Sequence, residues 1–216
     1  MRIDIADELA GRLTFAAVAG TGITVRRDDP DLWKDIEALS RELRERFADL
    51  KPSRVEDLRP ARDLYKAAGV DPTRRRPASE ALFRRVVRGR DLYRINNAVD
   101  ACNFCSLRFF LPIGLYDLEA VRGETVTLRK GREGEGYKGL GKDSVTLDGH
   151  ICVADAEGPF GHPSGDSFRT RITESTREIL WLIFAPADYD PARLDDHAAF
   201  SAETIRRACG GSTGRL

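Results

Sequence analysis

Three polar residues recur at intervals of three along one predicted helix. Asn97, Asp100 and Asn103 therefore lie on the same helical face. Their amide and carboxylate groups could hold a ligand through several hydrogen bonds. The same pattern has a local interpretation, in which Asn97 caps the helix and Asp100 stands where a capping box favours an acid. The two interpretations are compatible, and the sequence leaves both open.

Two cysteines form a C-x-x-C pair in the same predicted helix. Cys102 and Cys105, together with Cys152, His150 and His162, could supply the four N or S ligands of a zinc site. Zinc pairs of this type usually lie on a turn, and the sequence has no second pair. We therefore expect no metal and no cofactor, with the two thiols packed inward as small apolar groups. As a nucleophile, Cys102 would need a neighbouring base, for which the two histidines are candidates.

A pair of arginines follows an acidic residue in a stretch that alternates as a strand does. The pattern of residues 166–171 predicts that Arg169 and Arg171 point the same way. Two parallel guanidinium groups could clamp a phosphate or a carboxylate. The alternative is a surface ion pair with Glu174 or Glu178, which would contribute little stability. Because the surrounding stretch is acidic, the pair favours a binding role.

Charge is distributed unevenly along the chain, although the net charge is zero. Residues 51–94 contain 13 Lys and Arg against 6 Asp and Glu, whereas residues 143–203 contain 4 against 12. A basic stretch can hold phosphates even in a neutral protein. The predicted RNA-binding residues are Arg74, Arg75, Arg76, Arg84, Arg85 and Arg88. The alternative is that these arginines are solvated helix faces with local ion-pair partners.

The composition restricts the class of protein. The chain has 216 residues, 41% of them hydrophobic and 32% charged, which is typical of a globular domain. It has no apolar run long enough to span a bilayer, and its first eight residues are acidic where a signal peptide would be basic and then apolar. We expect a cytoplasmic protein without a membrane partner. Zero net charge argues against a dedicated nucleic-acid binder, no DNA partner is expected, and the oligomeric state stays open.

Hydrophobic spacing and turn residues predict the elements that position these groups. A short helix and strands at 13–19 and 23–25 come first, followed by a long helix that begins at Asp29 and Pro30. The later predicted helices are at 55–68, 79–88, from 96 onward and 191–208, and the strands at 125–128, 145–147, 151–154 and 179–184. We expect an N-terminal extension (1–50) packed on a core domain (51–209), and a frayed tail (210–216).

Several short segments between residues 79 and 184 form an ordered series. Segment 95–104 reads I-N-N-A-V-D-A-C-N-F and segment 111–117 reads L-P-I-G-L-Y-D, and further segments follow at 126–129, 134–135, 146–149 and 153–155. The series resembles the B3/B4 domain of the phenylalanyl-tRNA synthetase beta subunit. That family has I-N-N-V-V-D-V-T-N-Y, then Q-P-x-H-A-F-D, then V-R-x-A-x-x-G-E. The order of the motifs is more specific than any one of them.

The resemblance implies a fold and a partner. The fold is α+β, a three-layer α/β structure with a β-sandwich-like core of unusual topology and with helices N-terminal and on the outside. The partner is tRNA at its aminoacylated 3′ end, because the family domain hydrolyses wrongly tyrosylated tRNA. The pocket's Thr and Asn correspond to Cys102 and Asn103, whereas its His corresponds to Gly114 and its Glu falls near Leu182. Residues 160–166 replace the family's glycine-rich turn.

These observations support two main hypotheses. In the first, the protein hydrolyses mischarged aminoacyl-tRNA in trans, with Asn103 and Asp100 orienting a water molecule. The substrate-binding residues would be Asn97, Cys102, Ser106, Asp117, Arg169 and Arg171. In the second, the protein is a non-catalytic RNA- or tRNA-binding module that uses the basic stretch. A third possibility is that the pocket now accepts a small metabolite.

Overall fold

The computed structural model describes the backbone of residues 1–216 and the side chains of residues 1–141 and 144–216. Its central strand is β10 (Glu178–Pro186). The side chains of β10 alternate between two cores: Ile179, Trp181, Ile183 and Ala185 belong to one, and Leu180, Leu182 and Phe184 to the other. Successive residues of a strand point to opposite faces, so a strand that is apolar throughout must be covered on both.

The sheet that contains β10 has the order β11-β2-β10-β3 and is antiparallel. Its other strands are β2 (Leu13–Thr21), β3 (Ile113–Asp117) and β11 (Ser212–Arg215). β3 is therefore an edge strand, and its residue Gly114 lies opposite Leu182 of β10.

The second sheet has the order β1-β4-β7-β8-β9, in which β1 runs parallel to β4 and the other neighbours are antiparallel. Its strands are β1 (Arg2–Ile5), β4 (Thr125–Lys130), β7 (Ile151–Asp155), β8 (Gly158–His162) and β9 (Gly165–Asp166). A separate hairpin consists of β5 (Gly136–Gly139) and β6 (Lys142–Thr146). The second core lies between the two sheets, as in a β-sandwich.

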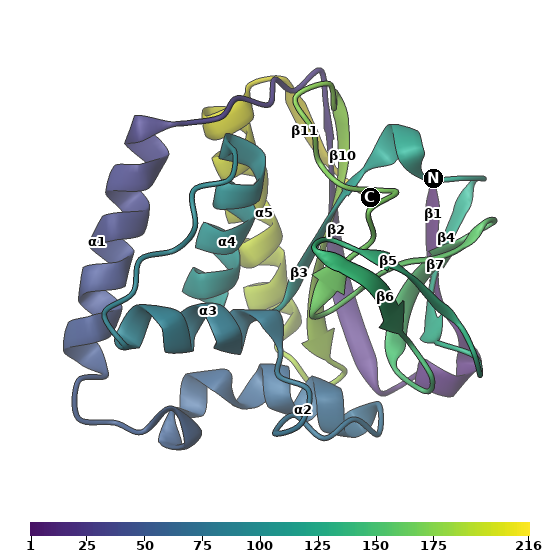
Figure 1. Ribbon diagram of the computed structural model, residues 1–216, viewed down its shortest axis with the longest axis horizontal. Helices are drawn as coiled ribbons and strands as arrows, with labels where there is room; N and C mark the ends of the chain where they lie inside the picture. The colour runs from purple at the N-terminus through teal and green to yellow at the C-terminus, as the bar shows by residue number, and fades with distance from the viewer.

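Helices form the third layer, on the opposite face of the β10 sheet (Figure 1). They are α1 (Pro30–Arg46), α3 (Ala78–Val87), α4 (Asn97–Phe109) and α5 (Pro191–Cys209). α2 (Arg59–Ala67) contributes Leu64 and Tyr65 to the core between the sheets. Short 3-10 helices are present at Asp7–Leu9, Pro52–Arg54, Glu56–Leu58 and Leu118–Ala120. The α+β, three-layer prediction is confirmed.

Local capping fixes where the helices begin. The Asp29 carboxylate accepts a hydrogen bond from the Leu32 N–H at 3.0 Å, which caps α1 as predicted. At α4 the cap is Asn96, whose side chain accepts from the Val99 N–H at 2.9 Å, so the prediction that Asn97 caps this helix was wrong. The error matters because it leaves the Asn97 side chain available for other contacts.

Two expected features near the chain ends differ in the structure. Residues 23–25 form no strand, and the N-terminal segment begins with β1 before its short helix. The tail predicted to be frayed instead forms β11, which pairs with β2 from Ser212 opposite Thr21 to Arg215 opposite Val18. Without β11, β2 would have an unpaired edge, and an exposed edge favours pairing with another chain. The domain boundary at residue 50 stays a prediction, although β2 lies within the β10 sheet. Among the described residues, no helix is long and apolar enough to cross a membrane.

Deleting residues 211–216 should therefore destabilise the protein. We expect the free energy of unfolding to fall by about 2–4 kcal/mol, at about 1 kcal/mol for each backbone hydrogen bond lost. Urea denaturation would measure it. The control is Arg215→Ala, which removes only the exposed ion pair with Asp195 and should cost less than about 1 kcal/mol. Equal, negligible effects of both changes would mean that β11 contributes nothing.

Candidate functional site

Two polar residues on α4 use their side chains in hydrogen bonds within the protein. The Asn97 amide is completely buried; it accepts from the Arg26 N–H at 2.8 Å and donates to the carbonyls of Thr24 and Ala208. It thereby ties α4 to the segment after β2 and to the end of α5. The Asp100 carboxylate is also buried and accepts from the Trp33 indole at 2.9 Å and from a backbone N–H at 3.0 Å. Burial raises the pKa of Asp100. Both residues hold the fold together.

Two more of the predicted substrate-binding residues have internal partners. The Ser106 hydroxyl is buried and donates to the Leu111 carbonyl at 2.7 Å. The Asp117 carboxylate accepts from the Thr176 hydroxyl at 2.6 Å and caps the 3-10 helix that follows β3. Groups with satisfied hydrogen bonds would have to give them up to hold a ligand, which makes these residues poor ligand contacts.

Asn103 differs from the other polar residues of α4. Its side chain is half-buried, and its amide makes no hydrogen bond to any group that the structure describes. A side-chain amide has two donors and one acceptor oxygen, so Asn103 can contact a ligand at no cost to the fold. Of the polar face predicted on this helix, Asn103 is thus the residue best suited to binding.

Next to Asn103, α4 packs along the outer edge of β3. The outward-facing backbone groups of this edge strand are bonded by three different segments. The Cys102 thiol contacts the Ile113 carbonyl at 3.9 Å, the Leu115 N–H donates to the Asp166 carboxylate, and the Asp117 N–H donates to the Thr170 carbonyl at 2.9 Å. We call Cys102, Tyr116 and Asp166, together with Asn103, the next residue after Cys102 on α4, the edge-strand site.

Asp166 brings an unusual carboxyl group to this site. The residue keeps some exposed surface, but its carboxyl group is buried. Burial raises the pKa of Asp166 to about 7, against the opposing effect of the Tyr116 hydroxyl and the Leu115 N–H. A carboxyl group with this pKa can accept and release a proton near neutral pH, as a general acid or base must.

Tyr116 fills the space around this carboxyl group. Its side chain is fully buried and lies against Gly114 and Gly161, where an added Cβ would overlap the ring. Its hydroxyl lies near Asp166 but makes no hydrogen bond of normal geometry with any described group. The absence of a side chain at Gly114, where the family has a His, therefore makes room for Tyr116. Leu182, near the position of the family's Glu, is buried opposite Gly114.

The two cysteines of the C-x-x-C pair are buried thiols. Cys102 and Cys105 are both buried. Burial raises the pKa of Cys102 well above its usual value and that of Cys105 to about 12, so both are thiols at neutral pH. Among the described residues, no three His, Cys, Asp or Glu side chains are grouped so that they could hold a metal ion.

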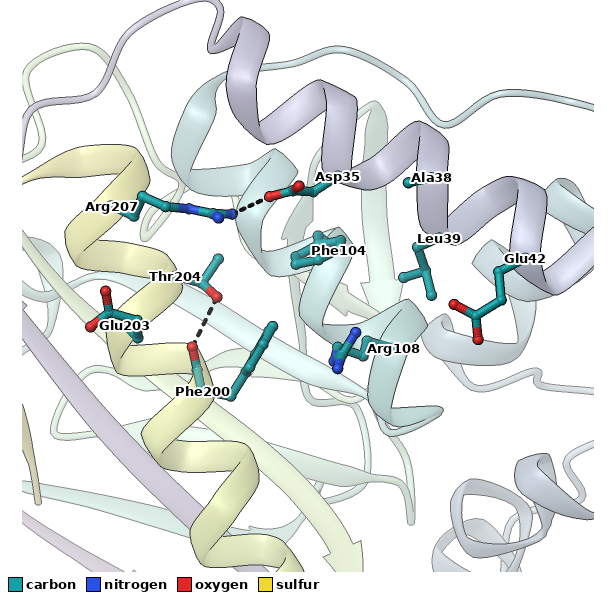
Figure 2. A pocket seen from close by; sticks show the side chains of 10 residues that line it. All are labelled: Asp35, Ala38, Leu39, Glu42, Phe104, Arg108, Phe200, Glu203, Thr204 and Arg207. Carbon is teal, nitrogen blue, oxygen red and sulfur yellow. Dashed lines mark hydrogen bonds and ion pairs between the residues drawn. The ribbon is translucent and has the colours of Figure 1, made fainter.

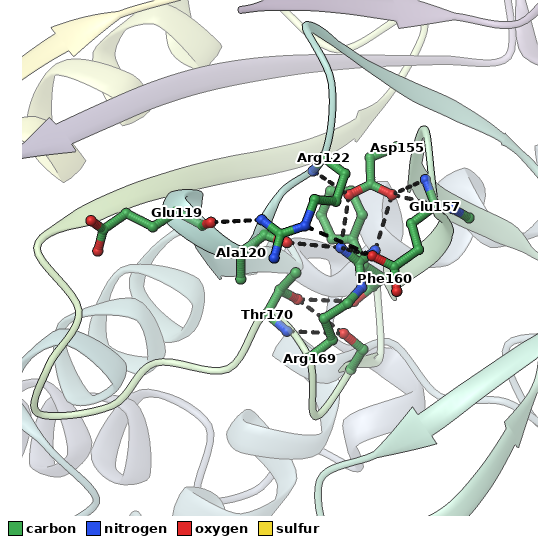
Figure 3. Close-up of polar contacts among 10 residues, drawn as sticks. Glu119, Ala120, Arg122, Asp155, Glu157, Phe160, Arg169 and Thr170 are labelled. Carbon is green, nitrogen blue, oxygen red and sulfur yellow. Dashed lines mark hydrogen bonds and ion pairs between the residues drawn. The ribbon is translucent and has the colours of Figure 1, made fainter.

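The two arginines expected to act as a clamp are separated. Ser167 forms an isolated β-bridge with Gly139 and residues 168–170 form a bend and a turn, so the predicted strand does not continue to Arg171. Arg169 makes a bidentate ion pair with Asp155 at 2.9 and 3.0 Å and donates to the Ala120 carbonyl (Figure 3). Arg171 turns outward, with its guanidinium group 3.6 Å from the centre of the Phe168 ring. Arg169 therefore joins the second sheet to the turn, and the pair cannot grip one anion together.

The predicted RNA-binding arginines also divide into two groups. Three contact the protein: Arg75 donates to the Thr146 carbonyl, Arg84 pairs with Glu80, and Arg85 donates to the Asp91 carbonyl and the Tyr93 hydroxyl. Arg74, Arg76 and Arg88 are exposed, with Arg74 lying 3.8 Å from Asp71 and Arg76 lying 3.9 Å from Glu80. Local partners therefore exist for five of the six arginines, and phosphate binding stays a prediction.

A cleft lies elsewhere, among α1, α4 and α5 (Figure 2). It measures about 400 Å³ and is lined by Leu39, Phe104 and Phe200. Two ion pairs at its rim, Asp35 with Arg207 and Glu203 with Arg206, neutralise most of its charge. None of the predicted site residues lines it, so size alone does not make it the functional site.

Sequence reasoning missed Asp166 and Tyr116. Tyr116 stands in the segment 111–117, which carries the family resemblance, and Asp166 ends the segment 160–166, which replaces the family's glycine-rich turn. Asp166 was considered only as the start of a strand, and Tyr116 stands where the family has a Phe. The additional hydroxyl and the replacement of the glycine-rich turn by a segment ending in an acid were the available signals.

The pKa of Asp166 predicts a pH-dependent stability. A folded-state pKa above the unfolded value means that the folded protein binds the proton more tightly, so stability falls as the pH rises from about 4 to 7. Asp166→Asn, which stays neutral, should be more stable than the wild type at pH 8 by about 4 kcal/mol and nearly equal to it below pH 4. Urea denaturation at several pH values would measure the difference. Glu133→Gln removes an exposed carboxylate as the control, and parallel pH profiles for wild type and Asp166→Asn would contradict the assignment.

Comparison with known proteins shows to which family this chain is similar. A model of the B3/4 domain matches residues 61–194. The phenylalanine–tRNA ligase beta subunit of Protochlamydia amoebophila is 31% identical over 99 residues, and that of Symbiobacterium thermophilum is 33% identical over 90 residues. These matches cover 45% and 40% of this chain but 12% and 10% of the relatives' lengths.

A solved structure is also similar to this chain. It is an N-terminal fragment of the phenylalanyl-tRNA synthetase beta subunit from Pyrococcus horikoshii, with a TM-score of 0.45 and 14% identity over 98% of this chain and 50% of that one. The family match covers more than half of the sequence and includes α4, β3, β9 and β10, the elements that carry or surround the edge-strand site. The chain belongs to the B3/4 domain family.

Proposed function

We propose that this protein binds the aminoacylated 3′ end of a tRNA and hydrolyses the ester of a mischarged amino acid in trans. The relatives that it matches are beta subunits of a tRNA ligase. The observation that carries the proposal is the unpaired, half-exposed amide of Asn103, one residue from the thiol that lies near Asp166.

Two residues of the edge-strand site, Asn103 and Asp166, have chemical roles in this proposal. The Asn103 amide would hydrogen-bond the ester or the terminal ribose and so hold the ester in place, and positioning alone supplies a large part of such a rate enhancement. Asp166, ionised above its pKa of about 7, would accept a proton from a water molecule. The water oxygen adds to the ester carbonyl carbon, the bond to the ribose oxygen breaks, and the proton passes to the leaving hydroxyl. Asp166 takes the role first expected of Asp100, whose carboxylate is occupied.

A deacylation panel tests the proposal. Purified protein is mixed with correctly and incorrectly charged tRNAs, together with Asn103→Ala and Asp166→Asn. We expect hydrolysis of one mischarged species, reduced about 100-fold or more in either variant, because removing a general base typically costs 10²–10⁴-fold and misplacing a bound substrate costs about 10²-fold. The wild-type rate should rise with pH and level off above about pH 7.

Arg108→Ala provides the matched control, because Arg108 is an exposed residue of the same helix. Its deacylation rate should equal that of the wild type. Unchanged rates in Asn103→Ala, with the protein still folded, would remove this residue from the mechanism. No hydrolysis of any charged tRNA would remove the enzymatic activity.

The second candidate function is RNA binding without chemistry. It is favoured by Tyr116, whose buried ring occupies the space between Gly114 and Gly161. An amino-acid side chain could enter there only if Tyr116 moved. The same observation weakens the idea of a pocket re-used for a small metabolite. This candidate predicts binding of uncharged tRNA with steep salt dependence and no deacylation; affinity that does not depend on salt would count against it.

A further inference from the structure

A basic groove lies between α2, α3 and the loop at residues 71–77, and the edge-strand site does not include it. The groove has a volume of about 300 Å³. Four of its lining residues are cations, Arg62, Lys66, Arg76 and Arg84, and the acid among them is Glu80. Because two of the cations come from α2 or its end and two from the loop and α3, the groove exists only in the folded protein.

One buried carboxylate lies close to three guanidinium groups in this groove. Glu80 is 3% exposed, and its two oxygens accept from Arg62 Nε and Arg84 Nε, both at 2.7 Å, while Arg76 Nε lies 3.9 Å away. Burial favours a raised pKa for Glu80, but the hydrogen bonds and charges of Arg62 and Arg84 outweigh it and lower the pKa. Glu80 is therefore ionised at neutral pH and neutralises one of the three positive charges, which leaves an excess of two.

The excess charge is held in place before any ligand arrives. Arg62 donates to the carbonyls of Pro52 at 2.7 Å and Ser53 at 3.3 Å, which fixes its guanidinium group. Arg84 and Arg76 keep most of their N–H donors unused, since only the Nε of each contacts Glu80. Ordered guanidinium groups with free donors recognise phosphate in a bidentate manner, and a fixed site loses little entropy on binding.

We propose that this groove binds a phosphate group, supplied by the backbone of an RNA strand. The excess positive charge attracts the singly charged phosphodiester groups of a strand, and the exposed Arg74 beside the groove extends the positive surface along it. The proposal rests on the proposed function in one respect only, namely that the RNA strand belongs to a tRNA. It assigns phosphate binding to Arg62 and Lys66, which the sequence did not single out, along with Arg76 and Arg84. Arg75 and Arg85, occupied by other contacts, are not part of it.

The test measures binding of an uncharged tRNA transcript by fluorescence anisotropy at several salt concentrations. The variant is Lys66→Ala with Arg76→Ala, because both side chains are substantially exposed and their loss leaves the Glu80 pairs with Arg62 and Arg84 intact. We expect affinity to fall about tenfold at low salt, with a shallower dependence of log K on log salt concentration.

The matched control is Arg132→Ala with Arg193→Ala, which removes two exposed cations outside the groove. This variant should keep its affinity within about twofold. Equal losses in both double variants would overturn the proposal, because they would mean that affinity depends on total charge and not on the groove.

A second measurement separates the possible sources of the phosphate. Inorganic phosphate is titrated into the wild type, and the Arg84 Nε–H resonance is followed by NMR. A shift of that resonance, lost in the variant with Lys66→Ala and Arg76→Ala, together with weakened tRNA binding by the same variant supports the proposal as stated. A shift without any effect of the groove variant on tRNA binding would replace the RNA strand by free phosphate. No shift and no binding defect would reject the site. Because uncharged tRNA carries no ester, none of these results depends on whether the protein hydrolyses one.

Discussion

The outer edge of β3 is the constraint on which the site depends. An edge strand that is covered by other segments must still satisfy its backbone N–H and C=O groups. Here no further strand adds to the sheet at that edge. The bonds come from a thiol of α4, the carboxylate of β9 and a carbonyl of the following turn. This requirement draws α4 and β9 onto one strand and puts an acid beside the helix that carries Asn103.

Burial of that acid has a consequence for both stability and chemistry. The carboxylate accepts hydrogen bonds, which favour its charged form, but burial outweighs them and raises its pKa to about 7. The same balance that makes the folded state less stable at high pH would let Asp166 exchange protons at neutral pH. Tyr116 contributes to the burial, because its ring occupies the space that Gly114 and Gly161 leave open.

The arginines show how tertiary contacts sort charges that are equivalent in sequence. Arg169 and Arg171 are two residues apart, yet one pairs with a buried carboxylate and the other lies over an exposed ring. In the basic stretch, Arg84 and Arg85 are neighbours on α3 and point to different partners, Glu80 and the segment at 91–93. An ionised carboxylate is costly to bury unless a cation pairs with it. The buried carboxylates of Asp155 and Glu80 therefore hold Arg169 and Arg84 in ion pairs within the protein.

The sequence by itself determined the local structure and the family. The helix that begins at Asp29, the strand at 179–184 and the ordered motifs depend on residues close together in the chain, so periodicity and capping rules predicted them. The sequence also singled out Asn103 as a candidate site residue, which stays a prediction. Only the tertiary structure decided that the tail pairs with β2, that Asp100 accepts a hydrogen bond from Trp33, and that Asp166 lies near Tyr116 of β3. These outcomes join residues tens to nearly two hundred positions apart, and no local pattern encodes which buried polar group will find which partner.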